Sequence, residues 1–414
     1  MSETVPTTDR LMSIDTLRGF ASLGILVMNI VAFGLPPDSY MSPIEPAAAG
    51  YAGEFSGANA AFWWIQHLFF DQKMMSIFSM LFGAGLIVLD TRYRARSGPT
   101  HSLAAIYYRR VCFLLVLGLF HAFVLWYGDI LTSYALCGLG LYPMRRLQPG
   151  LQIGIAALLL CIGGAMLVGM GALMSLAPTP ESGQPESAPT VERVDAQVAA
   201  FRGSFAQNIV ENSKTAIMLH TFMFIIWTSW RAASMMLLGM ALMQMGFFSA
   251  KWSAKAYGWT AAIGLLTGMP LTIASGVLGV EHNFSMAHTF LVVMPLNHFG
   301  SVAVALAYIA LVMLVHQSGR LAWLRTRLAA VGQIGLTSYL AQTLICTTIF
   351  YGRGLGYFGH FERAELIWFV LGVWGILLLA CPWWVARFRY GPAEWLWRMA
   401  TYLTIPPLRR IDAR

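Results

Sequence analysis

The first thirty residues hold an acid, an arginine and an asparagine at spacings that can do chemistry on one helix. Asp15 and Arg18 are three residues apart, so they share a helical face and can pair. Arg18 and Asn29 are eleven residues apart, which places them on one face about 16 Å apart along the axis. Arg18 alone is better explained as the positive flank of a membrane helix, with Asp15 marking the helix start. The spaced trio instead forms a polar track where polar groups are expensive, and this favours a function.

His67 and Asp71 form a second candidate pair. They are four residues apart and share a helical face. A carboxylate in this position can orient the imidazole and favour its protonated form, as a general base requires. An aromatic belt at the membrane interface, including Trp63 and Trp64, explains the same stretch equally well.

His121 and Asp129 form a third candidate pair. On a continuous helix they would be about 12 Å apart, too far for direct contact. A chain reversal at Gly128 would let both face one cavity. The simpler interpretations are a structurally hydrogen-bonded histidine and an aspartate that caps the next helix.

Arg231 lies in the middle of an apolar stretch. An uncompensated charge there would cost several kcal/mol, so the side chain must face the protein interior or a wet cavity. Pairing with Asp129 or Asp71 and binding of an anionic ligand are equally weighted interpretations.

No metal site is predicted from the histidines or the cysteines. The spacings of six and ten among three clustered histidines do not place two ligands on one helical face. The five cysteines lie in or beside apolar segments without CxxC or CxxH spacing, which is typical of small buried side chains. These residues are His282, His288 and His298, and Cys112, Cys137, Cys161, Cys346 and Cys381.

The composition predicts an all-α, polytopic integral membrane helix bundle. The 414 residues are 57% hydrophobic and only 11% charged, and the mean hydropathy is +0.62. Soluble proteins carry about 25% charged residues. The net charge of +8 is explained by basic loops on the cytoplasmic side of a lipid bilayer, so no nucleic-acid partner is expected.

Apolar stretches predict about ten transmembrane helices in a single domain that covers residues 1–414. The polar start Met1–Asp9 has no cleavable signal peptide, so the first helix is retained. The alternation of basic loops places both termini in the cytoplasm, in a bacterial inner membrane. The predicted helices lie near 14–36, 62–89, 111–127, 129–144, 150–176, 216–246, 257–278, 286–316, 329–352 and 365–386.

Two segments outside these helices have distinct compositions. Residues 177–213 form an outward-facing loop, in which Pro178–Thr190 is predicted to be disordered and Val191–Ile209 to be a helix on the membrane surface. Residues 387–414 form a basic cytoplasmic tail. No internal repeat indicates an inverted-repeat transporter.

Several motifs, in order from residue 10 to about 400, resemble the YeiB-like family of bacterial inner-membrane proteins, a domain of unknown function. The resemblance implies the architecture and no reaction. The motifs are Ser-Ile-Asp15-x-Leu-Arg18-Gly-Phe-Ala with Asn29-Ile, Phe78-Ser-Met-Leu-Phe-Gly83-Ala-Gly85, His121 with Trp126-Tyr-Gly-Asp129, Leu336-Thr-Ser-Tyr339-Leu-Ala-Gln342, Phe350-Tyr-Gly-Arg-Gly-Leu-Gly356 and Tyr390-Gly-Pro-Ala-Glu394-Trp-Leu-Trp397-Arg398.

The Asp-x-x-Arg-Gly…Asn pattern is also distantly similar to heparan-α-glucosaminide N-acetyltransferase and to acyltransferase-3 membrane enzymes. This similarity implies an acyl-CoA donor, first of all acetyl-CoA, that binds from the cytoplasm. Arg18 would meet its phosphates, and Asn29 would hydrogen-bond the acyl carbonyl.

The acyltransferase-3 enzymes have a histidine where this chain has Asn29, and an asparagine cannot act as a base. His67 or His121 is therefore the expected base, with Asp71 and Asp129 as their acidic partners. Asp15 and Arg231 join Arg18 as donor-binding candidates.

The sequence thus predicts a membrane acyltransferase whose acceptor is a hydroxyl or amine of an envelope glycan, a lipid or a small molecule. It would hold Arg18, Asn29 and a histidine in one cavity open to both sides. A transporter or flippase would have a midplane site with unwound helices and Asp71, Asp129 and Arg231 as gating charges. A non-catalytic membrane partner would have a fully paired polar cluster and no cavity. The oligomeric state is open, a homodimer included.

Overall fold

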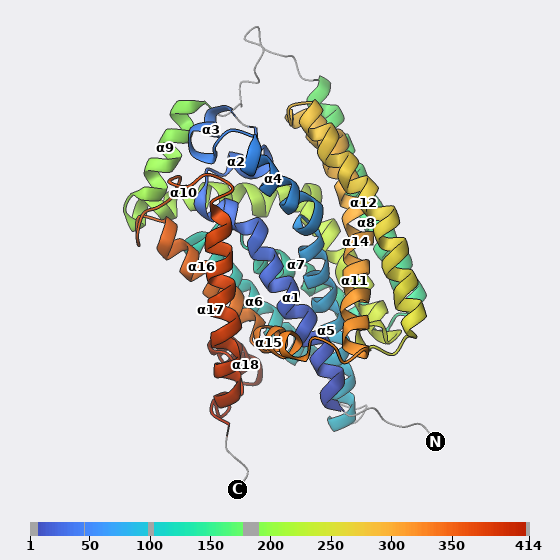
Figure 1. Ribbon diagram of the computed structural model, residues 1–414. Coiled ribbons are helices and arrows are strands. Elements are labelled where there is room, and N and C mark those ends of the chain that lie inside the picture. The colour runs from blue at the N-terminus through green and yellow to red at the C-terminus, as the bar shows by residue number, and fades with distance from the viewer. Residues whose placement is uncertain (1–6, 45, 98–102, 177–189, 411–414) are drawn as a thin grey trace.

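The computed structural model describes residues 7–44, 46–97, 103–176 and 190–410. This part of the chain is a bundle of helices (Figure 1), and its β-structure is limited to an isolated bridge between Phe388 and Arg409. The prediction of an all-α polytopic membrane bundle is confirmed.

Eight helices of the described residues are long and apolar enough to cross a membrane. Several are composite, because a π-helical segment continues an α-helix. They are α1 (Thr7–Gly34); α4 (Gly57–Ile65) with η2 (Gln66–Phe70) and α5 (Lys73–Ser97); α6 (Ala104–Phe120) with η3 (His121–Leu125); α8 (Pro149–Leu176); α10 (Phe205–Met218) with η5 (Leu219–Thr228) and α11 (Ser229–Gln244); α12 (Ala254–Glu281); α13 (Met286–His288) with η7 (Thr289–Val293) and α14 (Met294–Gln317); and α17 (Leu366–Arg387).

Two of the ten predicted spans differ in the structure. The fourth is α7 (Leu131–Leu141), whose 11 residues reach about 16 Å and cannot cross a hydrocarbon core of about 30 Å. The ninth is a pair of helices, α15 (Ala322–Gln333) and α16 (Gly335–Phe350), that meet at 85°. The described part of the chain therefore has eight spans, or nine if this bent pair counts as one.

Helix α1 lies at the centre of the bundle. It packs against α5, α15, α16 and α17, and 78% of its most apolar window is buried, against 22% for α8. Leu17, Ala21 and Ile30 of α1 are fully buried. Residues carried on α1 are therefore held by neighbours on several sides.

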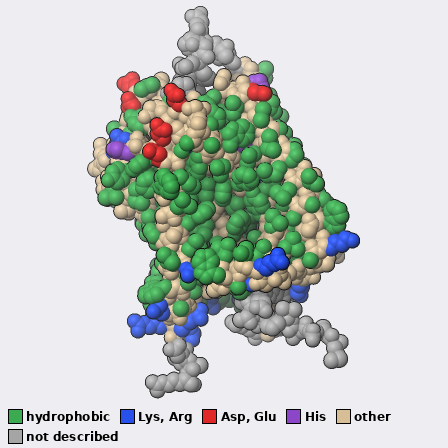
Figure 2. Space-filling model, viewed as in Figure 1, with side chains coloured by type: hydrophobic (Ala, Val, Ile, Leu, Met, Phe, Trp, Pro, Cys, Tyr) green, Lys and Arg blue, Asp and Glu red, His purple; other side chains and the backbone are tan. Residues whose placement is uncertain are grey.

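Charges separate along the bundle. In Figure 2, Lys and Arg side chains gather at one end and acidic side chains at the opposite end. The start of α1 and α18 (Pro392–Tyr402) both lie at the basic end (Figure 1). The orientation of this end toward the cytoplasm remains a prediction from the positive-inside rule.

The predicted outer loop contains more structure than expected. Most of the predicted disordered stretch Pro178–Thr190 lies outside the described residues, whereas its last residue, Thr190, is described and caps α9. The expected surface helix over 191–209 is instead α9 (Val191–Arg202) and the start of α10, which begins at a capping box formed by Ser204 and Gln207. Val194 and Phe201 of α9 are fully buried in the protein core, so this apolar face covers protein.

The basic tail also begins as packed structure. In α18, the Trp397 indole donates to the Arg110 carbonyl at 2.8 Å. The Glu394 carboxylate accepts from the backbone N–H of Leu336 at 2.7 Å and from the Thr337 hydroxyl at 2.5 Å. It thereby satisfies the first turn of α16 at the 85° break.

Candidate functional site

Two cavities lie inside the bundle and meet there. The larger has a volume of about 400 Å³ and the smaller about 250 Å³. Ile25, Ile130 and Tyr339 line both. The predicted single cavity open to both sides is therefore a pair of cavities with a shared wall of three residues.

The smaller cavity lies toward the basic end. Arg18, Arg110 and Glu394 line it, together with leucines and aromatic side chains. As its spacing predicted, Arg18 contacts Asp15 (Nη1 to Oδ1, 2.9 Å), and it also donates to the Gly332 carbonyl at 3.2 Å. The Arg18 side chain keeps 30% of its surface exposed, so it can also meet a ligand.

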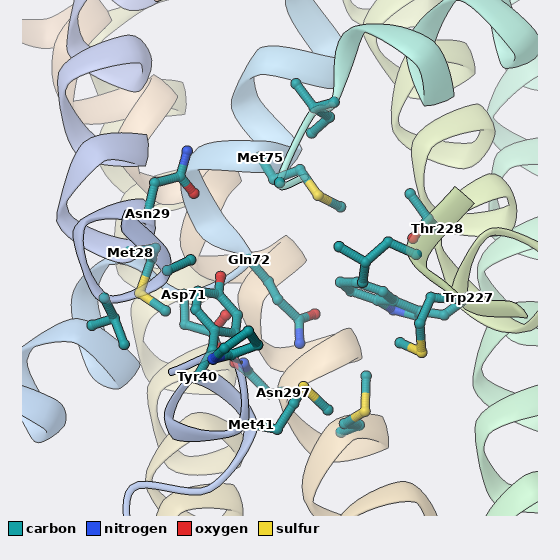
Figure 3. A pocket seen from close by; sticks show the side chains of 18 of the residues that line it. Met28, Asn29, Tyr40, Met41, Asp71, Gln72, Met75, Trp227, Thr228 and Asn297 are labelled. Carbon is teal, nitrogen blue, oxygen red and sulfur yellow. Dashed lines mark hydrogen bonds between the residues drawn. The ribbon is translucent and has the colours of Figure 1, made fainter. Parts of the chain in front are cut away.

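The larger cavity contains most of the predicted polar residues. Asn29, His67, Asp71 and Asp129 line it. In Figure 3, Asn29 and Asp71 lie on one side of the pocket, Trp227 and Thr228 lie on the other, and Gln72 lies between them. Arg18 and Asn29 therefore belong to different cavities, although both are on α1.

His67 and Asp71 contact each other, as their spacing predicted. The distance from His67 Nδ1 to Asp71 Oδ2 is 3.5 Å, and His67 Nε2 lies 3.1 Å from the Thr272 carbonyl. A carbonyl oxygen only accepts, so Nε2 carries a hydrogen, and Nδ1 faces a carboxylate. The ring therefore has no lone pair available to a substrate. Asp71 is the member of the pair whose side chain is 23% exposed.

Two residues that sequence reasoning missed complete this cluster. The Asn297 amide donates to Asp71 Oδ2 at 2.5 Å. The fully buried Lys73 donates to the His67 carbonyl at 2.6 Å and to Asn297 Oδ1 at 3.3 Å. Asn297 comes from α14, so no local spacing could indicate it. Lys73 follows Asp71 by two residues, and the sequence alone could have indicated it, because a lysine inside an apolar span needs polar partners.

His121 and Asp129 are brought together by the chain reversal at Gly128. Their Nδ1 and Oδ1 atoms are 2.9 Å apart, and both side chains are fully buried. His121 Nε2 is 2.9 Å from the Thr343 hydroxyl, and His121 lines neither of the two cavities. Asp129 also accepts from the Thr132 backbone N–H at 2.7 Å, as a cap of α7. The pair joins α6, α7 and α16, and in this arrangement His121 cannot reach an acceptor.

Arg231 pairs with neither Asp71 nor Asp129. Its guanidinium donates to Ser76 Oγ at 2.6 Å, Ser301 Oγ at 2.7 Å and the His298 carbonyl at 2.7 Å. It is fully buried and lines neither cavity. Its neutral partners take the place of a carboxylate. Because Arg231 lines neither cavity, the structure does not support its predicted role in binding the acyl donor.

The three clustered histidines do not converge. The rings of His282 and His288 are 3.7 Å apart between centroids, whereas His298 Nδ1 accepts from the Trp227 indole at 3.1 Å. No group of three or more possible metal ligands occurs among the residues that the structure describes.

Three of the four π-helical segments in the described part of the chain contribute directly to the larger cavity. Residues of η2, η5 and η7 line it, and Trp126, which follows η3, also lines it. π-Helical turns occur frequently at functional sites because they re-aim side chains within a helix. Hydropathy gives no signal for them.

Comparisons with known proteins match the chain to a family of uncharacterized proteins. A family model described as "Protein of unknown function (DUF418)" matches residues 242–404. The chain is 32% identical to the uncharacterized protein YeiB of Escherichia coli (strain K12), over 96% of this chain and 98% of that protein. It is 27% identical to the uncharacterized protein YxaH of Bacillus subtilis (strain 168), over 98% and 97% of the two chains. No solved structure matches the chain.

Proposed function

The chain belongs to the YeiB-like family of membrane proteins, and from that premise we propose that it is a transmembrane acyltransferase. The donor would be a cytoplasmic acyl-CoA, first of all acetyl-CoA, and the acceptor a hydroxyl or amine in the larger cavity. The two cavities that meet at Ile25, Ile130 and Tyr339 carry this proposal. An inner-membrane location follows from the same hypothesis.

The smaller cavity suits the thiol arm of the donor. Its volume of about 250 Å³ is less than the roughly 300–1,000 Å³ of pockets that enclose a whole drug-sized ligand. The acyl-pantetheine arm would enter the cavity, and the nucleotide would stay at the basic mouth. Arg18 and Arg110 line this cavity and would bind its phosphates.

The larger cavity supplies groups for the transfer step. The acceptor oxygen or nitrogen would attack the thioester carbonyl, and the Asn29 amide would donate to the developing oxyanion. Asp71 would take the acceptor's proton, with His67 and Asn297 holding its carboxylate. Collapse of the intermediate breaks the C–S bond, and the CoA thiolate leaves and takes up, through water, the proton that Asp71 received, which restores the Asp71 carboxylate.

Binding of acetyl-CoA and longer acyl-CoAs to the detergent-purified protein tests the proposal. We expect specific binding that Arg18→Ala weakens at least tenfold, because Arg18 would hold the donor phosphates. Arg320→Ala removes an exposed arginine that lines neither cavity, and it should bind like wild type. Absence of acyl-CoA binding, or equal losses in the two variants, would contradict the proposal.

A transporter or flippase is the second candidate. The π-helical segments around the larger cavity and the 85° break between α15 and α16 favour it, since transporters use interrupted helices. Flux assays in vesicles separate the two functions: a transporter delivers its substrate unchanged, and an acyltransferase releases an acylated product and free CoA. The non-catalytic alternative predicts a bundle without cavities, which differs from the structure.

A further inference from the structure

The outer part of the larger cavity has a buried arginine without an acidic partner. Arg363 precedes α17 and lines this cavity with only 3% of its surface exposed. Its Nη2 donates to the Ser39 carbonyl at 2.5 Å, which uses one of five N–H groups. Within the described part of the chain, no carboxylate forms an ion pair with Arg363.

The acids that line this cavity are already engaged elsewhere, whereas Asp38, next to Ser39, does not line it, and its buried Oδ2 has no hydrogen-bond partner among the described residues. The Glu362 carboxylate accepts from the Asn59 amide at 2.9 Å. Asp71 faces His67, and Asp129 contacts His121. The unpaired charge on this cavity wall is therefore positive. Burial lowers the pKa of Arg363 only to about 10, so the side chain stays charged at neutral pH.

The remainder of the cavity is mostly apolar. Methionines and aromatic side chains from α4, η5 and the α12–α14 region form much of its wall, among them Trp63, Met223, Phe284, Met286, Phe290 and Met294. A small free anion would leave this surface unused. A ligand with one charged group and an apolar chain would satisfy both parts of the cavity.

We propose that the larger cavity binds an anionic amphiphile, with its phosphate or carboxylate on Arg363 and its apolar part along the methionine and aromatic wall. This deepens the proposed function, on which it rests only for the statement that the amphiphile is the acyl acceptor. Binding itself requires no acyl-CoA. A planar guanidinium can donate two parallel hydrogen bonds to either anionic group.

The test compares three probes on the full-length, detergent-purified protein by titration calorimetry. They are dihexanoyl phosphatidic acid, uncharged dihexanoylglycerol and inorganic phosphate. We expect phosphatidic acid to bind at least tenfold more tightly than either of the others. Arg363→Gln should remove this advantage and leave dihexanoylglycerol binding unchanged.

Arg320→Gln is the matched control, because it removes the same charge from an exposed side chain that lines neither cavity. It should bind phosphatidic acid like wild type. If Arg363→Gln does not fold, Arg363→Lys keeps the charge without the planar fork, and it should weaken phosphatidic acid several-fold and leave dihexanoylglycerol unchanged.

Equal binding of phosphatidic acid and dihexanoylglycerol to the wild type would overturn the proposal. So would inorganic phosphate binding as tightly as phosphatidic acid, because the ligand would then be a small soluble anion. Neither result bears on acyl-CoA binding at Arg18, so failure here is distinguishable from failure of the acyltransferase proposal.

Discussion

Arg231 shows how a single residue can be charged inside the bundle without a counter-ion. Two serine hydroxyls and a backbone carbonyl share its guanidinium, and all of these groups are buried. The partners come from α5 and α14, so the arginine ties three spans together. Its role in the structure is to hold the helices around the larger cavity.

Replacement of Arg231 is therefore expected to affect stability. Arg231→Ala leaves buried hydroxyl and carbonyl groups unpaired, and we expect a loss of about 3 kcal/mol in the free energy of unfolding. Chemical unfolding in detergent micelles measures it. Arg94→Ala, whose side chain is 52% exposed in its pair with Asp90, should lose less than about 1 kcal/mol. Similar losses in the two variants would contradict the structural role of Arg231.

Helical spacing identified the residue pairs that lie close in the sequence. Asp15 contacts Arg18 because three residues return an α-helix to the same face. His67 also contacts Asp71, although Asp71 follows the π-helical segment η2 in a non-helical conformation. The contact between His121 and Asp129 depends on a turn that spacing cannot measure. Asn297 and Arg363 lie more than 200 residues from their partners Asp71 and Ser39, so their roles required the folded chain.

Among the elements, the junction of α15 and α16 depends on a carboxylate from α18. The chain turns by 85° there, and the first N–H groups of α16 would lack partners without Glu394. Burial raises the pKa of Glu394 above its usual value of 4.5, and the hydrogen bonds from Thr337 and Leu336 only partly offset this. The folded protein thus binds this proton more tightly than the unfolded chain.

The sign of the pH effect follows from this raised pKa. Below pH 4.5 the carboxyl is protonated in both states, and as pH rises through the folded-state pKa, stability is lost. Glu394→Gln cannot ionise, so its melting temperature should fall less than that of wild type between pH 4.5 and pH 7. Thermal unfolding at several pH values measures the difference. Parallel pH profiles for the two proteins would contradict a raised pKa of Glu394 in the folded protein.

Hydropathy predicted the long elements and failed where packing sets the length. The predicted spans before and after residues 129–144 are membrane-spanning helices in the structure. The span predicted over 129–144 is the short helix α7, because the chain reverses before Leu131 and the helix ends near Pro143. The break at Ile334 is equally invisible to hydropathy, since both arms are apolar. The apolar face of α9 is real, but only the fold shows that it covers protein.

For the molecule as a whole, the relation between the two cavities decides the proposed reaction. Donor and acceptor can meet only across the wall formed by Ile25, Ile130 and Tyr339. Ile25 lies on the central helix α1 and is nearly buried. A larger side chain at this position should separate the cavities and leave the basic mouth unchanged.

Ile25→Trp is expected to abolish acyl transfer with acyl-CoA binding retained within about twofold. Overpacking of this kind typically costs 1–3 kcal/mol, so the melting temperature must be measured alongside. Ile25→Val, which does not enlarge the shared wall, should transfer acyl groups like wild type. Full activity of a folded Ile25→Trp protein would show that the reaction does not cross this wall.

Composition and family resemblance sufficed to predict the class of molecule, a multi-pass helical membrane protein of the YeiB-like family. They did not predict that Arg18 and Asn29 line different cavities, although the residues share one helix. That division depends on side chains such as Tyr339 and Ile130 that reach α1 from other elements.

The π-helical segment η2 also affects how this chain should be aligned with its homologues. A π-helical turn contains an extra residue compared with an α-helical turn, so the chain gains one position between Gln66 and Phe70 without gaining a full turn. A homologue with one residue fewer here could close this segment into ordinary α-helical turns and keep the face that α4 presents. Pairwise alignments of this region therefore need a gap placed by geometry, because a misplaced gap would match His67 with a residue from another position of the helix.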